Sequence, residues 1–113
     1  MKRGEIWTLK DRNYATKARP VVIVQADLEN YYDSIILCLF TSFIAENAYS
    51  RVKIEPTVEN GLEKTSYVMT DKIITVEKTL LGKHIGTLTS HQMHQISGKL
   101  AKILDIHRND IEE

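Results

Sequence analysis

The sequence predicts a small, mostly β fold in which short strands form a strongly curved barrel and one C-terminal helix packs against it. Short β-branched segments separated by polar turns indicate the strands, and the only long stretch with helical spacing comes last, at residues 90–104. The chain has 113 residues, of which 42% are hydrophobic and 27% charged, which suits one globular core. We therefore expect a single domain over residues 1–113, with its edge strands protected by barrel closure.

The first two strands are expected at residues 5–9 and 20–24. The first segment alternates polar and apolar residues, as a strand with one buried face does. The second is continuously β-branched and suits a strand buried on both faces, with Pro20 at its beginning because proline lacks a ladder donor. Residues 10–19 between them are mostly polar and are expected to form an exposed loop.

Three further strands are expected in the middle of the chain, at residues 34–41, 51–54 and 66–74. The first contains the longest apolar run, and the second alternates strictly, which indicates a half-exposed strand. The connecting segments are polar or carry turn-forming residues: 26–33, 42–50, and the region of Pro56, Asn60 and Gly61.

The C-terminal third should contain a short helical turn at residues 77–81, a last strand at 83–88 and the helix. Thr89 and Gln92 have the spacing of a capping box at the start of this helix. Apolar residues at three- and four-residue spacings form the stripe that faces the sheet: Met93, Ile96, Leu100 and Ile103. The polar residues 107–113 are expected to fray.

The charge balance excludes a strong overall attraction to nucleic acid, because fifteen basic and fifteen acidic side chains cancel. Binding must come from local asymmetry, which the first nineteen residues provide. Their cations, set against only two acids, are Lys2, Arg3, Lys10, Arg12, Lys17 and Arg19.

No apolar run approaches the ~20 residues of a membrane span, and no signal segment is recognised, so a cytoplasmic protein is expected. Cys38, between two leucines, is interpreted as core.

Six groups of residues, in order and at compatible spacings, resemble the MazF/PemK/Kid family of toxins over essentially the whole chain. They are Arg3-Gly4-Glu5-Ile6-Trp7, Ala18-Arg19-Pro20-Val21-Val22-Ile23-Val24-Gln25, Phe40-Thr41-Ser42, Asn60-Gly61-Leu62, Val68-Met69-Thr70-Asp71-Lys72-Ile73, and Leu81-Gly82 with Ile85-Gly86-Thr87-Leu88. The resemblance implies an SH3-like barrel that forms a homodimer and cuts single-stranded mRNA. It also implies a cognate antitoxin that silences the toxin.

The resemblance places the family's catalytic arginine on Arg19 and its catalytic threonine on Thr41. Some members also use an acidic residue, which corresponds to Asp71 here. In the plasmid members an arginine stands two positions before that acid, and this chain has Met69 instead. Taken alone, Arg19 would more often be a solvated charge, Thr41 a residue that ends a strand, and Asp71 an exposed charge.

RNA can be cut by its own 2′-hydroxyl, so an enzyme needs a base, a charge stabiliser and an acid, and no cofactor is expected. The guanidinium of Arg19 can hold two phosphate oxygens while remaining charged. Thr41 would add a hydroxyl donor, and Asp71, or a water that it orients, would be the base. Preorganised donors of this kind often supply the largest part of a rate enhancement.

RNA contacts are expected from the loop after the first strand and from the end of the third, through Lys10, Arg12, Tyr14, Lys17 and Ser42. Cations with an aromatic side chain can follow a phosphate backbone and stack a base, although a solvated loop is an equally good interpretation.

Three histidines are further candidate site residues. His91 and His94 are three residues apart on the helix, but no Cys or acid at matching spacing accompanies them, so solvent exposure is preferred to a metal site. His84 titrates near neutrality and could tune the site.

Two other functions fit the same fold class. One is a non-catalytic module that binds RNA or peptides, since a fold does not determine a function. The other is a gyrase poison of the same fold, whose apolar C-terminal tail would contain a Trp. The only tryptophan in this chain is Trp7, which disfavours that alternative.

Overall fold

The fold is described by a computed structural model for residues 1–10, 18–27, 32–44 and 49–111. In chain order the elements are β1 (Glu5–Leu9), β2 (Arg19–Ile23), β3 (Ser34–Thr41), β4 (Arg51–Ile54), β5 (Ser66–Glu77), the 3₁₀ turn η1 (Lys78–Leu80), β6 (Leu81–Thr87), α1 (Ser90–Ile103) and α2 (Arg108–Ile111).

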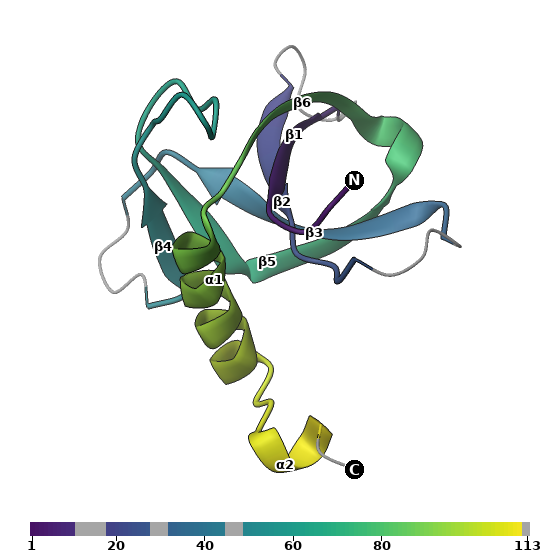
Figure 1. Ribbon diagram of the computed structural model, residues 1–113, viewed down its shortest axis with the longest axis vertical. Coiled ribbons are helices and arrows are strands. Elements are labelled where there is room, and N and C mark those ends of the chain that lie inside the picture. The colour runs from purple at the N-terminus through teal and green to yellow at the C-terminus, as the bar shows by residue number, and fades with distance from the viewer. Residues whose placement is uncertain (11–17, 28–31, 45–48, 112–113) are drawn as a thin grey trace.

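The six strands form one antiparallel sheet in the order β4-β5-β3-β2-β1-β6. Figure 1 shows five of them, β1, β2, β3, β5 and β6, curling around a common centre, with α1 beside β4 and β5. The expected mainly β fold with a C-terminal helix is confirmed. The ring is not closed by hydrogen bonds, because β4 and β6 are the two ends of the sheet in the described part of the chain.

Each face of the sheet carries its own core. The first lies between the sheet and α1 and includes Ile6, Val22 and Val68, all fully buried. The second lies on the other face and includes Val21 and Leu37. Because β2 contributes to both cores, its continuous β-branched sequence is buried on both sides, as the sequence predicts.

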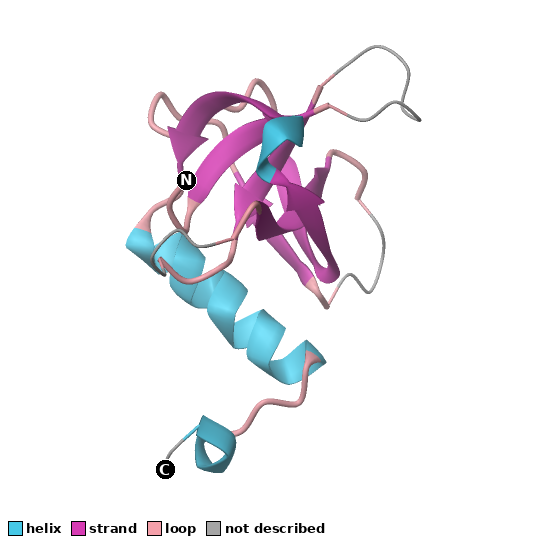
Figure 2. Cartoon of the chain, turned by 90° about the vertical axis from the view of Figure 1, so that its right-hand side faces the viewer, coloured by secondary structure: helices cyan, strands magenta, loops and turns pink. Residues whose placement is uncertain are grey.

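Helix α1 begins with the expected capping box. The Thr89 hydroxyl accepts a hydrogen bond from the Gln92 N–H at 3.1 Å, and the Gln92 side chain accepts one from the Thr89 N–H at 2.9 Å. Met93 and Ile96 are buried against the sheet. The Arg3 guanidinium also joins the helix to the sheet, because it donates to Ser97 Oγ at 2.6 Å and to the Val24 carbonyl at 3.1 Å. Figure 2 shows α1 lying across one side of the sheet, with α2 beyond it.

Two boundaries differ from the expectation. β5 continues to Glu77 because its second half pairs with the N-terminal half of β3, after an irregularity at residues 70–72. Of the C-terminal residues 107–113, expected to fray, Arg108–Ile111 form α2, where the Asp110 carboxylate accepts a 2.8 Å hydrogen bond from the His107 N–H and caps the turn. Residues 112–113 lie outside the described residues. Within the described residues, neither helix has the length and apolarity needed to cross a bilayer.

The turn before β5 is held by a buried asparagine. Asn60 is 1% exposed; its side chain accepts from the Thr57 and Leu62 N–H groups, both at 3.0 Å, and donates to the Glu55 carbonyl at 2.9 Å. Gly61 follows with a φ of +69°, and a Cβ there would lie 2.0 Å from the Ile85 carbonyl oxygen. The turn therefore contacts β6 with its backbone, which only glycine permits.

Candidate active site

The strand pairing aligns four side chains in a row across the sheet. Val21 of β2 pairs with Leu39 of β3, and the same register continued by two residues places Arg19 opposite Thr41. Thr41 pairs with Tyr67 of β5, and Tyr67 pairs with Lys53 of β4. Neighbouring strands are about 4.8 Å apart, and directly opposed side chains point to the same face. We call Arg19, Thr41, Tyr67 and Lys53 the cross-strand row.

Arg19 and Thr41 stand at strand ends that meet at one rim of the sheet. Arg19 is the first residue of β2 and is exposed, while Thr41 is the last residue of β3 and is half-buried. The Thr41 hydroxyl oxygen accepts a 3.1 Å hydrogen bond from the Phe43 N–H, and it still carries a proton that it can donate. A cation and an oriented hydroxyl are thereby presented side by side.

Asp71 is not part of this row. It lies four residues beyond Tyr67 along β5, within the irregularity, and its carboxylate accepts a 3.2 Å hydrogen bond from Ser50 Oγ. At about 3.3 Å per residue, less the bulge, the separation from the row is on the order of 10 Å. Burial, and to a smaller extent the Asp71 charge, raises the pKa of the Cys38 thiol to about 12. Asp71 itself is exposed.

Two of the expected RNA-binding residues lie close to the row. Ser42 is exposed and directly follows Thr41. Lys10 follows β1, the strand on the other side of Arg19, and its N–H donates to the Leu80 carbonyl at 3.0 Å. The other three, Arg12, Tyr14 and Lys17, are outside the described residues.

Tyr67 and Lys53 were not predicted from the sequence as members of the site, because their place beside Thr41 depends on the strand register. A cavity of about 580 Å³ lies near β2 and β5, but none of the four residues of the row lines it. Its lining includes Ala18 and Pro20, which flank Arg19, and Ser66, which flanks Tyr67.

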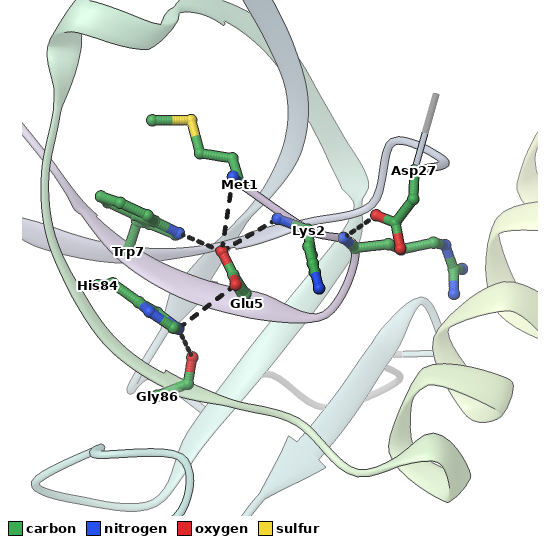
Figure 3. A network of polar contacts seen from close by, with 8 residues as sticks. Met1, Lys2, Glu5, Trp7, Asp27, His84 and Gly86 are labelled. Carbon is green, nitrogen blue, oxygen red and sulfur yellow. Dashed lines mark hydrogen bonds and ion pairs between the residues drawn. The ribbon is translucent and has the colours of Figure 1, made fainter. Parts of the chain in front are cut away.

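His84 belongs to a polar network at the other end of β1 (Figure 3). Its ring stacks on Trp7 with centroids 5.3 Å apart, and its Nε2 lies 3.9 Å from the Glu5 carboxylate. That carboxylate also accepts hydrogen bonds at 3.0 Å from the Lys2 N–H and the Trp7 indole, and it faces the N-terminal amine at 4.0 Å.

The network lowers the pKa of Glu5. Partial burial alone would raise that pKa, but the hydrogen bonds from Lys2 and Trp7, with the charges of His84 and the N-terminus, outweigh it. The Lys2–Arg3 segment is held further by a 2.6 Å hydrogen bond from the Arg3 N–H to Asp27. In the structure, His84 helps to anchor the N-terminal segment.

A curled antiparallel sheet followed by C-terminal helices resembles a small SH3-like β barrel that is left open between β4 and β6. The profile of the PemK-like, MazF-like toxins of type II toxin-antitoxin systems matches residues 2–104. The chain therefore belongs to this toxin family.

Individual relatives agree with this assignment. A protein of Mycolicibacterium smegmatis described as a probable endoribonuclease MazF is 35% identical over 107 residues, covering 94% of this chain and 98% of the relative. A mycobacterial endoribonuclease solved in complex with its cognate antitoxin superimposes with a TM-score of 0.78 at 25% identity, covering 95% of this chain and 97% of that one. A MazE–MazF structure from Deinococcus radiodurans gives 0.76 at 15% identity, covering 95% and 97%, and supports the fold alone.

Proposed function

We propose that the chain is the toxin of a type II toxin-antitoxin pair and acts as an endoribonuclease that cuts single-stranded mRNA in the cytoplasm without a metal. Family membership and the endoribonuclease relative support the class of reaction. The observation that carries the site is the register that sets Arg19 opposite Thr41 at one rim of the sheet.

The reaction is a transesterification within the RNA. The 2′-hydroxyl oxygen attacks the adjacent phosphorus, the bond from phosphorus to the 5′-oxygen breaks, and a 2′,3′-cyclic phosphate and a free 5′-hydroxyl result. Negative charge grows on the non-bridging oxygens in the transition state. Arg19 can hold two of these oxygens, and the Thr41 hydroxyl can donate to one of them.

The proton of the attacking hydroxyl needs a separate acceptor. A general base must come within about 3 Å of the proton donor, or reach it through one water. Asp71, the base expected from the sequence, is on the order of 10 Å from the row along β5. We therefore propose that Arg19 and Thr41 act by stabilising charge, and that solvent takes the proton of the 2′-hydroxyl and supplies one to the departing 5′-oxygen. We also propose that Asp71 orders the β4–β5 end of the sheet through Ser50.

The test is cleavage of an end-labelled, mixed-sequence single-stranded RNA by the purified chain, free of antitoxin and in excess EDTA. The expected products carry 2′,3′-cyclic phosphates and 5′-hydroxyls. Arg19→Ala should slow cleavage about a hundredfold or more while the chain remains folded, and Lys83→Ala, which removes an exposed cation on β6, should cleave normally. Binding of the RNA without cleavage by the wild-type chain would instead identify a binding module.

We also propose that the toxin works as a homodimer and is silenced by an antitoxin. The solved relative in complex with its cognate antitoxin supports the antitoxin, and the family resemblance implies the homodimer. Light scattering at micromolar concentration should give twice the mass of the 13.0 kDa chain. A monomer at that concentration would contradict the dimer.

A further inference from the structure

An aromatic side chain lies next to the proposed catalytic pair. Tyr67 is the third member of the cross-strand row, directly opposite Thr41 on one side and Lys53 on the other. Val68, the next residue of β5, is buried in the first core, so Tyr67 points to the opposite face of the sheet. Tyr67 is half-buried, so part of its side chain reaches solvent beside Thr41.

A second aromatic side chain is held near Tyr67 by two hydrogen bonds of its own backbone. Phe43 is 71% exposed; its N–H donates to the Thr41 hydroxyl at 3.1 Å, and its carbonyl accepts from the Arg51 guanidinium at 3.0 Å. Thr41 belongs to β3 and Arg51 to β4, and β5 lies between these two strands. The two bonds therefore hold Phe43 close to β5 and Tyr67. Because this backbone is already fixed, ordering the ring against a ligand costs less entropy.

Positive charges flank the aromatic part of the row. Arg19 lies on one side of Tyr67 and Lys53 on the other, three strand spacings or about 14 Å apart. The Lys53 ammonium faces the Glu55 carboxylate at 3.3 Å, but the two side chains are 60% and 62% exposed, where such a pair contributes little. Sites for single-stranded nucleic acid combine cations for the phosphates with rings on which the bases stack. The order of the row suits that alternation.

We propose that Tyr67 stacks on the base of a nucleotide that adjoins the scissile phosphate, and that Phe43 covers the other face of the same base. Lys53 then lies toward the next phosphate along the strand. This inference rests on the proposed function, because it adds residues that hold the RNA beside Arg19 and Thr41. The two rings position the substrate and take no part in bond making.

Two other roles for these side chains lead to different results. Aromatic residues are favoured in half-exposed strands, so Tyr67 could serve only to pack β5. Its loss would then slow the cleavage of every RNA alike. Phe43 could instead contact a second copy of the chain, and its loss would then change the molecular mass in solution.

The test is a cycle of protein and RNA changes, measured as single-turnover cleavage in excess EDTA. The cleavage site is mapped in the mixed-sequence RNA, and a short RNA with that site is made intact or with an abasic ribonucleotide on the 5′ or the 3′ side of the scissile bond. The abasic unit keeps its 2′-hydroxyl, so the reacting groups are unchanged. A wild-type chain that leaves the intact RNA uncut would contradict the proposed function itself, whereas a chain that cuts it allows the stacking to be tested alone.

The variants separate the ring from the bulk of the side chain. Tyr67→Leu removes the aromatic face and keeps an apolar side chain, whereas Tyr67→Phe keeps the ring. Phe43→Ala truncates an exposed side chain and should fold normally. The matched control is Tyr32→Ala, which removes an exposed tyrosine near the opposite end of β3 from Thr41.

We expect Phe43→Ala to slow cleavage of the intact RNA at least about fivefold, the lower end of the cost of losing a stacking ring. Tyr67→Leu should slow it at least about threefold, since leucine keeps some contact, and Tyr32→Ala less than about twofold. On the RNA that lacks the stacked base, both site variants should slow cleavage less than about twofold, because the interaction that they remove is already absent.

Any of four results would overturn the proposal. These are equal slowing of the intact RNA and both abasic RNAs by Tyr67→Leu, a Tyr67→Phe variant as slow as Tyr67→Leu, loss of the two effects at different nucleotides, and a change of molecular mass in Phe43→Ala. The last result would assign Phe43 to contacts between copies.

Discussion

Arg19 and Thr41 form a proposed site only as a pair. Each is an ordinary residue at the end of a strand, and twenty-one positions separate them in the chain. The β2–β3 register sets them opposite one another at a rim that Lys10 and Ser42 also reach. A phosphodiester placed there meets a planar cation and a hydroxyl donor together.

The position of Asp71 leads to a prediction about the proton acceptor. Asp71→Asn should change the rate constant for cleavage less than about threefold, because the carboxylate is outside the reach of a general base. The measurement is single-turnover cleavage from pH 5 to 9, with the exposed Asp27→Asn as the matched substitution. A loss of about a hundredfold or more, together with disappearance of the acidic limb of the profile, would restore Asp71 as the base.

Glu5 predicts how stability depends on pH. Its pKa is lower in the folded chain than the ordinary value of 4.5, so its contribution is complete above that value and is lost as pH falls through the native pKa. Thermal melts between pH 2.5 and 7 should show this loss, and Glu5→Gln should flatten the curve below 4.5. A Glu5→Gln variant that keeps the wild-type slope in this range would show that the network does not stabilise the carboxylate.

Among the elements, the turn held by Asn60 should be sensitive to substitution. Asn60→Ala removes the acceptor of two backbone N–H groups in a buried position and should reduce the free energy of unfolding by about 2 kcal/mol. Glu59→Ala, an exposed neighbour, should change it by less than about 0.5 kcal/mol. Urea denaturation measures both, and equal effects would mean that the side chain of Asn60 does not hold the turn.

Most elements were predictable from the sequence because their signals are local. β3 and β4 have the expected bounds, β2 is buried on both faces, and the capping box begins α1. The extension of β5 and the bulge at residues 70–72 were not predictable, because they depend on which strand lies beside β5. The same holds for Tyr67 and Lys53, whose place in the row depends on strand pairing. The proposed catalytic residues, Arg19 and Thr41, were named through the family resemblance.

The whole molecule has no net charge, so its binding of RNA should depend on a few local contacts. If Arg19, Lys53 and Lys10 each neutralise one phosphate, the logarithm of the binding constant should fall with the logarithm of salt concentration with a slope of about −2. Arg19→Ala should reduce that slope by about 0.7. A 2′-O-methyl RNA prevents cleavage during the titration, and a slope of about −5 or steeper would show that many more cations engage RNA than the row provides.

The most direct test of the account is a double-mutant cycle on Arg19→Ala and Thr41→Val, measured as single-turnover cleavage in EDTA. Removing one preorganised donor costs on the order of 10²- to 10³-fold. If the two side chains stabilise the same phosphate oxygens, the double variant should be little slower than Arg19→Ala alone. Losses that multiply fully in the double variant would show that the two residues act independently, and the proposed joint site would be contradicted.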